Sequence, residues 1–351
     1  MSTQPAIDGP TIGVIVCCRD EALVIERRLA NLALCDWPPS DRAHRVVIVD
    51  DGSSDATARL TEQWIAKLHS PRAKFELLKN RARPGKSAAI QCGLTQLGEQ
   101  VDVVVLTDAD VVSVPDALVQ LVDAFRSSAN VGMVSGSQSF VNALRDDGSL
   151  GSDRSSSASE IYDRVTGLVR RLESRFGRVF SVHGQLLAWR ADLGLAPKSS
   201  LAADDLDLMR QVRLAHKRVV LAKRARFFEC KPERELMRQA QAVRRARAYV
   251  QFAATLNPGE AQDGLTRWQW RFYKYVPSAL PLAVAPTCFA ICGLMGARIW
   301  IHPEGIAMVV LSAMAAITFI GRVVWPKANL IAEAKRLERE KPMQDRWLTA
   351  R

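Results

Sequence analysis

Short, continuous runs of apolar residues alternate with longer segments in which apolar residues recur every three or four positions. The runs at 11–16, 45–49 and 101–106 are too short for typical helices and too continuous for half-exposed strands, so each predicts a strand buried on both faces. Segments of helical periodicity lie between them. Strand and helix in this alternation predict an α/β fold with a mostly parallel sheet and flanking helices.

The same two patterns predict the remaining elements of the first 230 residues. The helix after the first strand has apolar positions at Leu23, Ile25, Leu29 and Leu32, and Asp55 is the expected N-cap of the next helix. The stretch 142–159 is rich in Ser, Asp and Gly and predicts a mobile surface loop. Further helices are expected at 56–68, 87–97, 115–125, 161–176 and 204–215, and further strands at 75–78, 131–135, 180–190 and 218–222.

The pattern changes after residue 230. An arginine-rich helix is expected at 231–255, and residues 267–275 mix aromatic side chains with cations, as at a bilayer interface. The apolar runs 276–301 and 305–325 each exceed the ~20 residues that a membrane-spanning helix needs. We therefore predict a catalytic domain at 1–230, a basic interfacial segment at 231–274, a transmembrane hairpin within 275–325 and a cytosolic charged tail at 326–351. A buried helical pair or a re-entrant hairpin is the alternative to the membrane hairpin.

The formal charge of +11 permits nucleic-acid binding, but its distribution argues against it. Residues 231–274 hold nine Lys or Arg against four Asp or Glu, and residues 322–351 hold eight against four. These segments flank the two apolar runs, which is the bias of Lys and Arg toward the cytoplasmic side of a membrane. The sequence therefore predicts a multi-pass protein of the inner (plasma) membrane with a cytosolic catalytic domain, and no nucleic-acid partner.

The seven cysteines show no zinc-site spacing, and their odd number favours a reducing compartment. The polar stretch 1–10 is not expected to be a signal peptide. Both observations agree with a cytosolic catalytic domain.

Carboxylates follow the most apolar strand directly, at Asp108 and Asp110. Side chains two residues apart point the same way while the backbone stays extended. Two such carboxylates are costly to hold together without a cation, and Mg²⁺ typically takes one or two of them plus substrate phosphates. Because open α/β sheets bind ligands at the carboxyl ends of their strands, residues 108–110, called the metal motif below, predict a metal-diphosphate site. An acidic turn is the alternative.

Ordered motifs along the chain resemble those of the family 2 glycosyltransferases, enzymes of the GT-A (Rossmann-like) fold that use nucleotide sugars. The resemblance covers about residues 11–251. It comprises the turn at 49–57, Gly85-Lys86 before a helix, Thr107-Asp108-Ala109-Asp110, the segment 184–190, the pair Asp204-Asp205 and, more weakly, Gln241-Ala242-Val243-Arg244-Arg245.

On the donor side, the resemblance implies that Asp50 and Asp51 bind the nucleotide, with Asp51 accepting from a uracil N–H. Asp108 and Asp110 would hold Mg²⁺ or Mn²⁺ against the diphosphate, and Asp108 would also contact the donor. Lys86 would add positive charge there. Turn capping is the alternative role for the first pair.

On the acceptor side, the resemblance implies that Asp205 is the base that takes the proton from the attacking hydroxyl, so that direct displacement inverts the anomeric centre. A pair of helix N-terminal carboxylates favoured by the helix dipole is the alternative. His183 is expected to be a satisfied strand histidine, and Trp189 either stacks on a sugar or belongs to the core. The remaining substrate-binding candidates are Gly184, Gln185, Asp204, Gln241 and Arg244.

Two departures from the family pattern favour transfer of a single sugar over synthesis of a polymer. Arg245 replaces the tryptophan of the polymer synthases, and two membrane helices are few for a translocation channel. We therefore expect a glycosyltransferase of the hexosyltransferase type that moves one sugar to a lipid-linked or cell-envelope glycan. The alternatives are a processive polysaccharide synthase and a non-catalytic scaffold subunit that binds a sugar nucleotide. A nucleotidyltransferase would usually carry a Gly-rich loop after its first strand, and residues 17–21 contain no glycine.

Overall fold

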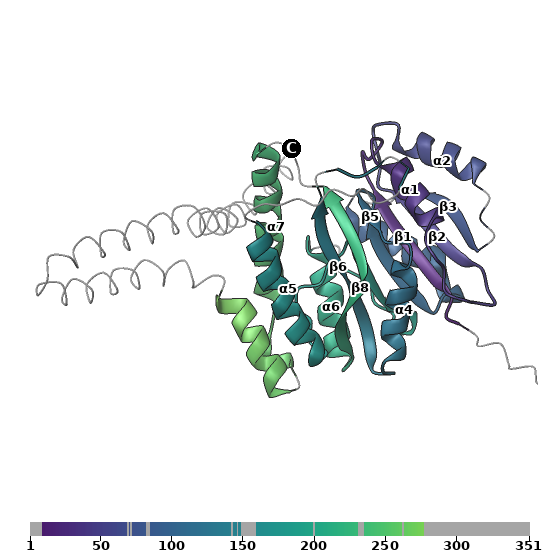
Figure 1. The fold of residues 1–351 in the computed structure, drawn as a ribbon. Coiled ribbons are helices and arrows are strands. Elements are labelled where there is room, and N and C mark those ends of the chain that lie inside the picture. Colours follow the sequence, from purple (N-terminus) through teal and green to yellow (C-terminus); the bar gives the residue numbers. More distant parts are fainter. Residues whose placement is uncertain are drawn as a thin grey trace, which may run out of the picture. The chain divides into compact units, whose positions relative to one another are not determined.

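This computed structural model describes residues 9–276 except 69, 71, 82–84, 142, 146, 149–158, 199–200, 231–234 and 262 (Figure 1). The chain divides into two compact units, Met1–Pro232 and Glu233–Arg351, and each is described by itself. The first unit contains a central sheet with helices packed against it.

Strands and helices alternate strictly through the first half of this unit, as the apolar pattern predicts. The strand pairs β1–β2, β1–β4 and β2–β3 are all parallel. Nearly every residue of β1, β2 and β4 is buried, which explains their continuous apolar runs. The elements are β1 (Ile12–Cys18), α1 (Ile25–Ala33), β2 (His44–Asp50), α2 (Thr57–Lys67), β3 (Ala73–Lys79), α3 (Lys86–Leu97), the 3₁₀ turn Gly98–Gln100 and β4 (Val103–Asp108).

The second half completes an eight-stranded mixed sheet of order β3-β2-β1-β4-β7-β6-β8-β5. Here β7 runs antiparallel to β4 and β6, and β5 runs antiparallel to β8. The α/β architecture is confirmed, but the expectation of a mostly parallel sheet fails around β7, because apolar patterns report burial and not strand direction. The elements are β5 (Val111–Ser113), α4 (Ala117–Arg126), β6 (Val131–Val141), α5 (Ser159–Arg175), β7 (Leu186–Arg190), the 3₁₀ turn Ala191–Leu193, α6 (Asp204–Leu214) and β8 (Arg218–Cys230).

Helices pack on both faces of the sheet (Figure 1). On one face, Val14 of β1 joins a core with Leu29 of α1 and Leu121 of α4. The next residue, Ile15, points to the other face and contacts α3 at Gly93. A Cβ atom at position 93 would lie 2.8 Å from Ile15 Cγ2, so the missing side chain lets α3 approach the sheet closely.

Two local predictions are wrong. The strand expected at 180–190 begins only at Leu186, so Gly184 lies in the loop before β7. Leu23 was expected on the buried face of a helix, but α1 begins at Ile25 and Leu23 is 96% exposed.

The described part of the second unit contains α7 (Glu235–Thr255), a 3₁₀ turn at Pro258–Glu260 and a helix at residues 264–276. The Tyr249 hydroxyl donates to the Tyr273 carbonyl, and Lys274 Nζ donates to the Leu256 carbonyl at 2.6 Å. These bonds join α7 and the residue that follows it to the helix at residues 264–276.

Several predictions concern residues outside the described ones. They are most of the loop 142–159, both expected membrane helices from residue 277 onward, and the tail 326–351. Among the helices that the structure does describe, none combines the length and apolar character needed to cross a bilayer.

Candidate functional site

The carboxyl ends of β1, β2 and β4 meet at one edge of the sheet. In the parallel registers, Cys18 pairs with Asp50 and Cys17 pairs with Asp108. Because β1 lies between β2 and β4, the strand order reverses here, and open α/β sheets bind ligands at such a switch point. The fold therefore brings the predicted nucleotide residues and the metal motif to the same edge.

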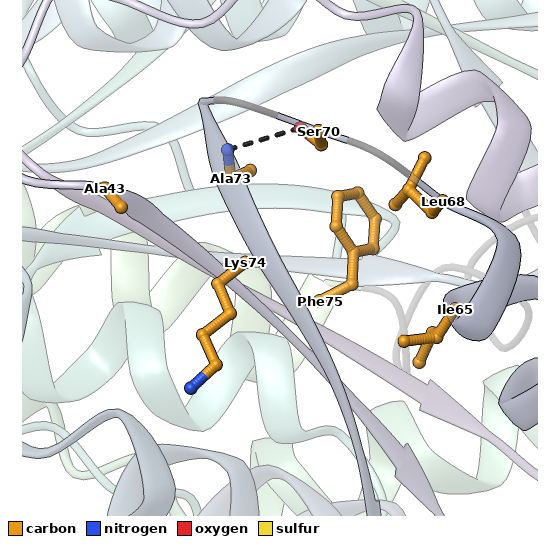
Figure 2. Close-up of a pocket in the computed structure, with 7 residues that line it drawn as sticks. All are labelled: Ala43, Ile65, Leu68, Ser70, Ala73, Lys74 and Phe75. Atoms are coloured by element: carbon orange, nitrogen blue, oxygen red, sulfur yellow. Dashed lines mark hydrogen bonds between the residues drawn. The ribbon is translucent and has the colours of Figure 1, made fainter.

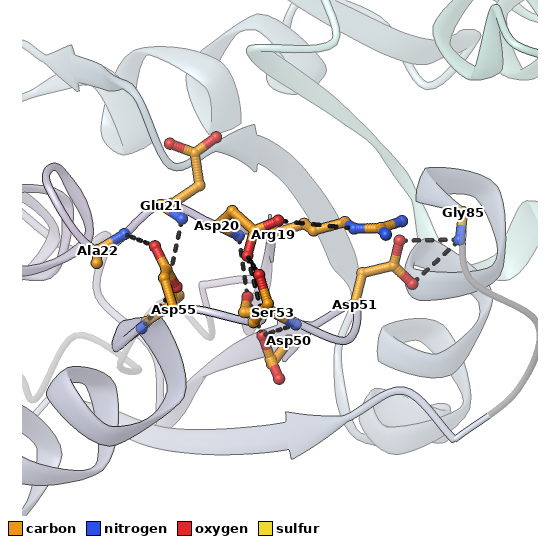
Figure 3. Close-up of polar contacts among 11 residues, drawn as sticks. Arg19, Asp20, Glu21, Ala22, Asp50, Asp51, Ser53, Asp55 and Gly85 are labelled. Carbon is orange, nitrogen blue, oxygen red and sulfur yellow. Dashed lines mark hydrogen bonds and ion pairs between the residues drawn. The ribbon is translucent and has the colours of Figure 1, made fainter.

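Asp51 anchors the loop that leads into α3 (Figure 3). Its carboxylate is buried and accepts from Asn80 Nδ2 at 2.6 Å and from the Gly85 N–H at 2.8 Å. Gly85 has a φ of 153°, a backbone angle that favours glycine. The contact fixes the start of α3 and with it Lys86, while lone pairs of the carboxylate remain for a ligand.

The turn after β2 is held by its own carboxylates, as the turn-capping alternative predicts. Asp50 Oδ1 accepts from the Ser53 N–H and hydroxyl. Asp55 was expected to be the N-cap of α2, but the N-cap is Ala56, the next residue. Asp55 Oδ1 instead accepts from the Thr57 N–H at 2.9 Å within the turn. Asp50 thus has a structural role whether or not it also contacts a nucleotide.

The β1–α1 loop is tied to this turn (Figure 3). Asp20 Oδ1 accepts from the Ser54 N–H at 2.7 Å, and Asp55 Oδ2 accepts from the Ala22 N–H at 3.0 Å. Asp20 has a positive φ of 56°, which this pairing supports. Hydrogen bonds therefore connect the β1–α1 loop to the turn after β2, and both segments border the same edge of the sheet.

Lys86 bridges two carboxylates from different elements. Its Nζ lies 2.7 Å from Asp108 Oδ1 on β4 and 3.9 Å from Asp204 Oδ2 on α6. Burial lowers the pKa of the ammonium, but the carboxylates outweigh burial and hold that pKa well above its usual range. Burial also raises the pKa of Asp204, whose Oδ2 is buried without a hydrogen-bond partner. The edge thus concentrates negative charge around one fixed cation.

Asp205 lies against Gly184 at the start of α6. The Gly184 and Leu206 N–H groups hydrogen-bond to its carboxylate. A Cβ atom at position 184 would lie 3.4 Å from Asp205 Cβ and 3.7 Å from its Oδ2, so Gly184 packs directly against this carboxylate. Burial, together with the neighbouring Asp204, raises the pKa of Asp205 to about 6. A carboxylate with that pKa is ionised but basic at neutral pH.

Gln185 connects this loop to the sheet. Its carbonyl accepts from the Thr107 hydroxyl at 2.7 Å, and its Nε2 donates to Glu229 Oε2 at 3.4 Å. Gln138 donates to the same carboxylate oxygen of the buried Glu229. The predicted acceptor-side loop is therefore fixed to the strand that carries the metal motif.

The metal motif itself is not an extended segment. β4 ends at Asp108, and residues 109–110 form a turn before β5, so the predicted reason for the two carboxylates to converge is wrong. Burial, and then the charges of Asp110 and Asp108, raise the pKa of Glu21 to about 7. Sequence reasoning missed Glu21, although its position directly after the first strand places it at this edge.

The other candidates separate into three cases. Trp189 is 1% exposed and belongs to the core. His183 is buried, and its ring contacts Arg170 and the edge of Phe227. Gln241 and Arg244 lie on α7 in the second unit, so their expected substrate roles stay predictions.

An apolar hollow at the amino-terminal end of β3 lies away from these carboxylates (Figure 2). It is lined by Ile65 and Leu68 near the end of α2, by Phe75 and Lys74, and by Ala43. None of these is a candidate site residue.

The residues at the sheet edge suit a hard divalent cation. Carboxylate oxygens are the ligands that Mg²⁺ prefers, and it commonly adds substrate phosphates to one or two of them. Within the described residues, no cluster of three or more His, Cys, Asp or Glu forms a metal site from protein ligands alone. Asp108 and Asp110 offer carboxylate oxygens of this kind at the sheet edge.

Three comparisons place the chain among known proteins. The sequence profile described as "Glycosyltransferase like family 2" matches residues 10–261. A poly-beta-1,6-N-acetyl-D-glucosamine synthase of Staphylococcus epidermidis is 24% identical over 187 residues, which are 52% of this chain and 40% of that protein. The synthase of the same name from Staphylococcus aureus (strain COL) is 26% identical over 177 residues, 49% of this chain and 38% of that protein. The matches thus span about two fifths of these relatives.

Two solved structures share the fold. The mannosyltransferase PcManGT from Pyrobaculum calidifontis, in complex with GDP-Man and Mn²⁺, has a TM-score of 0.67 at 23% identity and covers 95% of this chain and 87% of its own. S. aureus TarS 1-349, in complex with UDP-GlcNAc, has a TM-score of 0.52 at 17% identity and covers 94% and 92%. At these identities the likeness is one of fold.

Proposed function

Since this chain belongs to glycosyltransferase family 2 and is a glycosyltransferase, we propose that it transfers a sugar from a UDP-linked donor to a hydroxyl of a lipid-linked or cell-envelope glycan, with inversion at the anomeric carbon. The observation that carries this proposal is the position of Asp205. Its carboxylate has a raised pKa, lies directly beside Gly184 and is one residue from the carboxylate that faces Lys86.

In the proposed reaction, Asp205 accepts the proton of the acceptor hydroxyl as the hydroxyl oxygen attacks the anomeric carbon. The bond between that carbon and the phosphate oxygen breaks, and the nucleoside diphosphate leaves with the electron pair. Lys86 supports the negative charge that builds on the diphosphate. A divalent cation held by Asp108 and Asp110 would supply Lewis-acid stabilisation of the same charge. Attack from the face opposite the leaving group inverts the centre.

The structure supports the donor side through Asp51. Its buried carboxylate keeps acceptor capacity at the sheet edge after its bonds to Asn80 and Gly85, as recognition of a uracil N–H requires. The two solved neighbours hold different nucleotide sugars, GDP-Man and UDP-GlcNAc, so the base is the part of the proposal most in need of a test.

Processive synthesis is the second candidate, and the curated relatives favour it, because both are named as polymer synthases. Arg245, where synthases carry tryptophan, favours single transfer. Measuring the lengths of the products distinguishes single transfer from processive synthesis. Long polymer made by the purified protein alone would establish the synthase.

We expect one nucleotide sugar from a panel of UDP and GDP donors to release its nucleoside diphosphate in the presence of Mn²⁺ or Mg²⁺. Chelation of the metal should reduce this turnover at least a hundredfold, because cation stabilisation of the leaving group is worth several kcal/mol, at about 1.4 kcal/mol per tenfold. The measurement is release of nucleotide by detergent-purified protein with crude membrane lipid as acceptor. Full turnover in a chelator would contradict the metal-assisted mechanism, and a GDP-sugar donor would contradict the choice of uridine.

We also propose that the chain is an integral protein of the inner membrane with a cytosolic catalytic domain. The helix at residues 264–276 supports this, because Trp268, Phe272 and Tyr275 are 63%, 43% and 57% exposed, while Trp270 is buried. Exposed aromatic residues next to cations such as Arg271 suit the headgroup region.

The full chain should therefore remain in the membrane pellet after both high-salt and alkaline carbonate washes. Charge attraction alone weakens in salt, whereas spanning helices resist both treatments. Immunoblotting of pellet and supernatant is the measurement. Release by salt alone would contradict the transmembrane hairpin, and an Arg267→Gln/Arg271→Gln variant should be retained as well as the wild type.

A further inference from the structure

Helix α1 carries two polar residues on the face that it packs against the sheet. Arg28 is 1% exposed and Asn31 is 3% exposed, among the apolar side chains of Ile25, Leu29 and Leu32. The periodicity of a core-facing helix would place apolar residues at both positions. Since a buried polar group is costly unless it is hydrogen-bonded, the partners of these side chains indicate what they are for.

The Arg28 guanidinium contacts the strands on both sides of the metal motif. Nη2 donates to Thr107 Oγ1 at 2.6 Å, at the end of β4. Nη1 lies 3.3 Å from Ser113 Oγ and 3.4 Å from the Val111 carbonyl oxygen, both on β5. The turn at 108–110 is therefore held at its beginning and at its end by one planar group.

Asn31 adds further hydrogen bonds between α1 and β5. Its Oδ1 accepts from Arg28 Nη1 at 2.7 Å and from the Ser113 N–H at 2.9 Å, and its Nδ2 donates to the Ser113 carbonyl at 2.9 Å. The side chain pairs with Ser113 as a neighbouring strand would. Arg28 and Asn31 thus join α1 to β4 and β5 as one hydrogen-bonded unit.

The charge of Arg28 has no ion-pair partner among the described residues, and its Nε is buried without a hydrogen bond. Burial lowers the pKa of the guanidinium to about 10, so it remains a cation at neutral pH, and Cys35, followed by Asp108 and Asp110, acts to raise that pKa. Burying an uncompensated charge is expensive. The nearby carboxylates of the metal motif are the negative charges that offset it.

We infer that Arg28 is a positioning residue for metal and diphosphate binding: its bonds to β4 and β5 hold Asp108 and Asp110 in the arrangement that a cation shared with a diphosphate needs. This inference rests on the proposed function. It concerns a side chain that touches neither substrate nor cation and acts through Thr107 and Ser113.

The same network reaches the acceptor side. Thr107 Oγ1 accepts from Arg28 and donates to the Gln185 carbonyl at 2.7 Å, next to Gly184 and its contact with Asp205. One hydroxyl therefore links the support of the metal motif to the loop beside the base. Loss of that hydroxyl should disturb donor binding without removing any group that meets the donor.

The test compares Arg28→Met with a matched control, Arg45→Met, in the full chain. Arg45 is also a multiply bonded, partly buried arginine, contacting Gln96, Gln100 and Glu76 at the opposite end of the sheet. The readouts are the unfolding midpoint and the dissociation constant of UDP or GDP, whichever the wild type binds, in the presence of Mn²⁺. Arg28→Met should weaken nucleotide binding at least tenfold in Mn²⁺ and by less than twofold without it, whereas Arg45→Met should lower the midpoint alone.

Because Arg28→Met risks misfolding, Thr107→Val and Thr107→Ser provide a second, milder pair. Valine keeps the shape of threonine and removes the hydroxyl, so Mn²⁺-dependent binding should weaken about fivefold, and serine should restore it to within twofold of the wild type. Unchanged Mn²⁺-dependent binding in folded Arg28→Met and Thr107→Val proteins would overturn the inference. Asp108→Asn separates this failure from failure of the proposed function: if that variant also binds Mn²⁺ and nucleotide normally, the metal site itself is wrong.

Discussion

Replacing Asp205 by asparagine should reduce sugar transfer about 10²- to 10⁴-fold, the usual contribution of a general base. Asparagine keeps the size of the side chain, and its amide oxygen can still accept from the Leu206 N–H, but it cannot take a proton. Donor binding should remain within about twofold of the wild type, since Lys86 and Asp108 are untouched. The measurement is kcat for transfer beside the dissociation constant of the donor.

The same variant should be more stable than the wild type at neutral pH. The folded-state pKa of Asp205, about 6, lies above its unfolded value of 3.8, so the native state binds more protons between these values. Stability from this group therefore falls as pH rises through that window. Asp205→Asn should gain about 3 kcal/mol at pH 7.5 and well under about 1 kcal/mol at pH 4, since the pKa difference of about 2.2 units corresponds to about 1.4 kcal/mol per unit.

Two further measurements check the base. The kcat/KM of the wild type should fall as pH drops below about 6, because protonated Asp205 cannot act. Asp207→Asn is the matched control on α6. Asp207 Oδ2 accepts hydrogen bonds from the Lys198 N–H and from Gln211 Nε2, and the residue has no proposed catalytic role. Transfer by Asp205→Asn at the wild-type rate would refute the base assignment.

Replacing Asp108 by asparagine should abolish metal-dependent transfer, with a loss of about a hundredfold or more. The substitution removes one anionic ligand of the proposed cation site and also the 2.7 Å ion pair that fixes Lys86. Both the affinity for Mn²⁺ with nucleotide and kcat should fall, because the lost charge acts on the bound diphosphate and on the leaving group. Titration of Mn²⁺ in nucleotide-binding and transfer assays measures the two effects.

Asp102→Asn is the control for this variant. Asp102 precedes the opposite end of β4, pairs with Arg42 and accepts from the Thr11 N–H, far from the proposed chemistry. It should cost some stability and leave the requirement for metal unchanged. An Asp108→Asn protein with the wild-type metal response would show that the acidic-turn alternative is the correct one for this residue.

The local pattern of the sequence was sufficient to predict the elements that carry the site. Continuous apolar runs identified β1, β2 and β4, because strands buried on both faces leave no room for polar residues. The carboxylates at Asp50, Asp108 and Asp204 could then be assigned to strand and helix ends, since these positions follow from where each apolar pattern stops. The gathering of Asp50 and Asp108 at one edge followed from the parallel direction of these three strands.

Other features of the structure depend on contacts between residues far apart in the chain, and local sequence patterns do not predict such contacts. The direction of β7 is one of them, because a strand buried on both faces has the same apolar sequence pattern whether it runs parallel or antiparallel to its neighbours. The burial of Arg28 is another, because only its bonds to Thr107 and Ser113 explain why a charged residue lies on the buried face of α1.

The sequence by itself thus determined the α/β class, the boundaries of most elements and the edge where the carboxylates gather. These features depend on burial patterns and turn-forming residues that are close together in the chain. Only the tertiary structure decided which groups meet there: Lys86 between Asp108 and Asp204, and Gly184 against Asp205. These pairs join β4, α3, α6 and the loop before β7. Distances between such elements, and the pKa values that follow from them, are set by packing across the whole sheet.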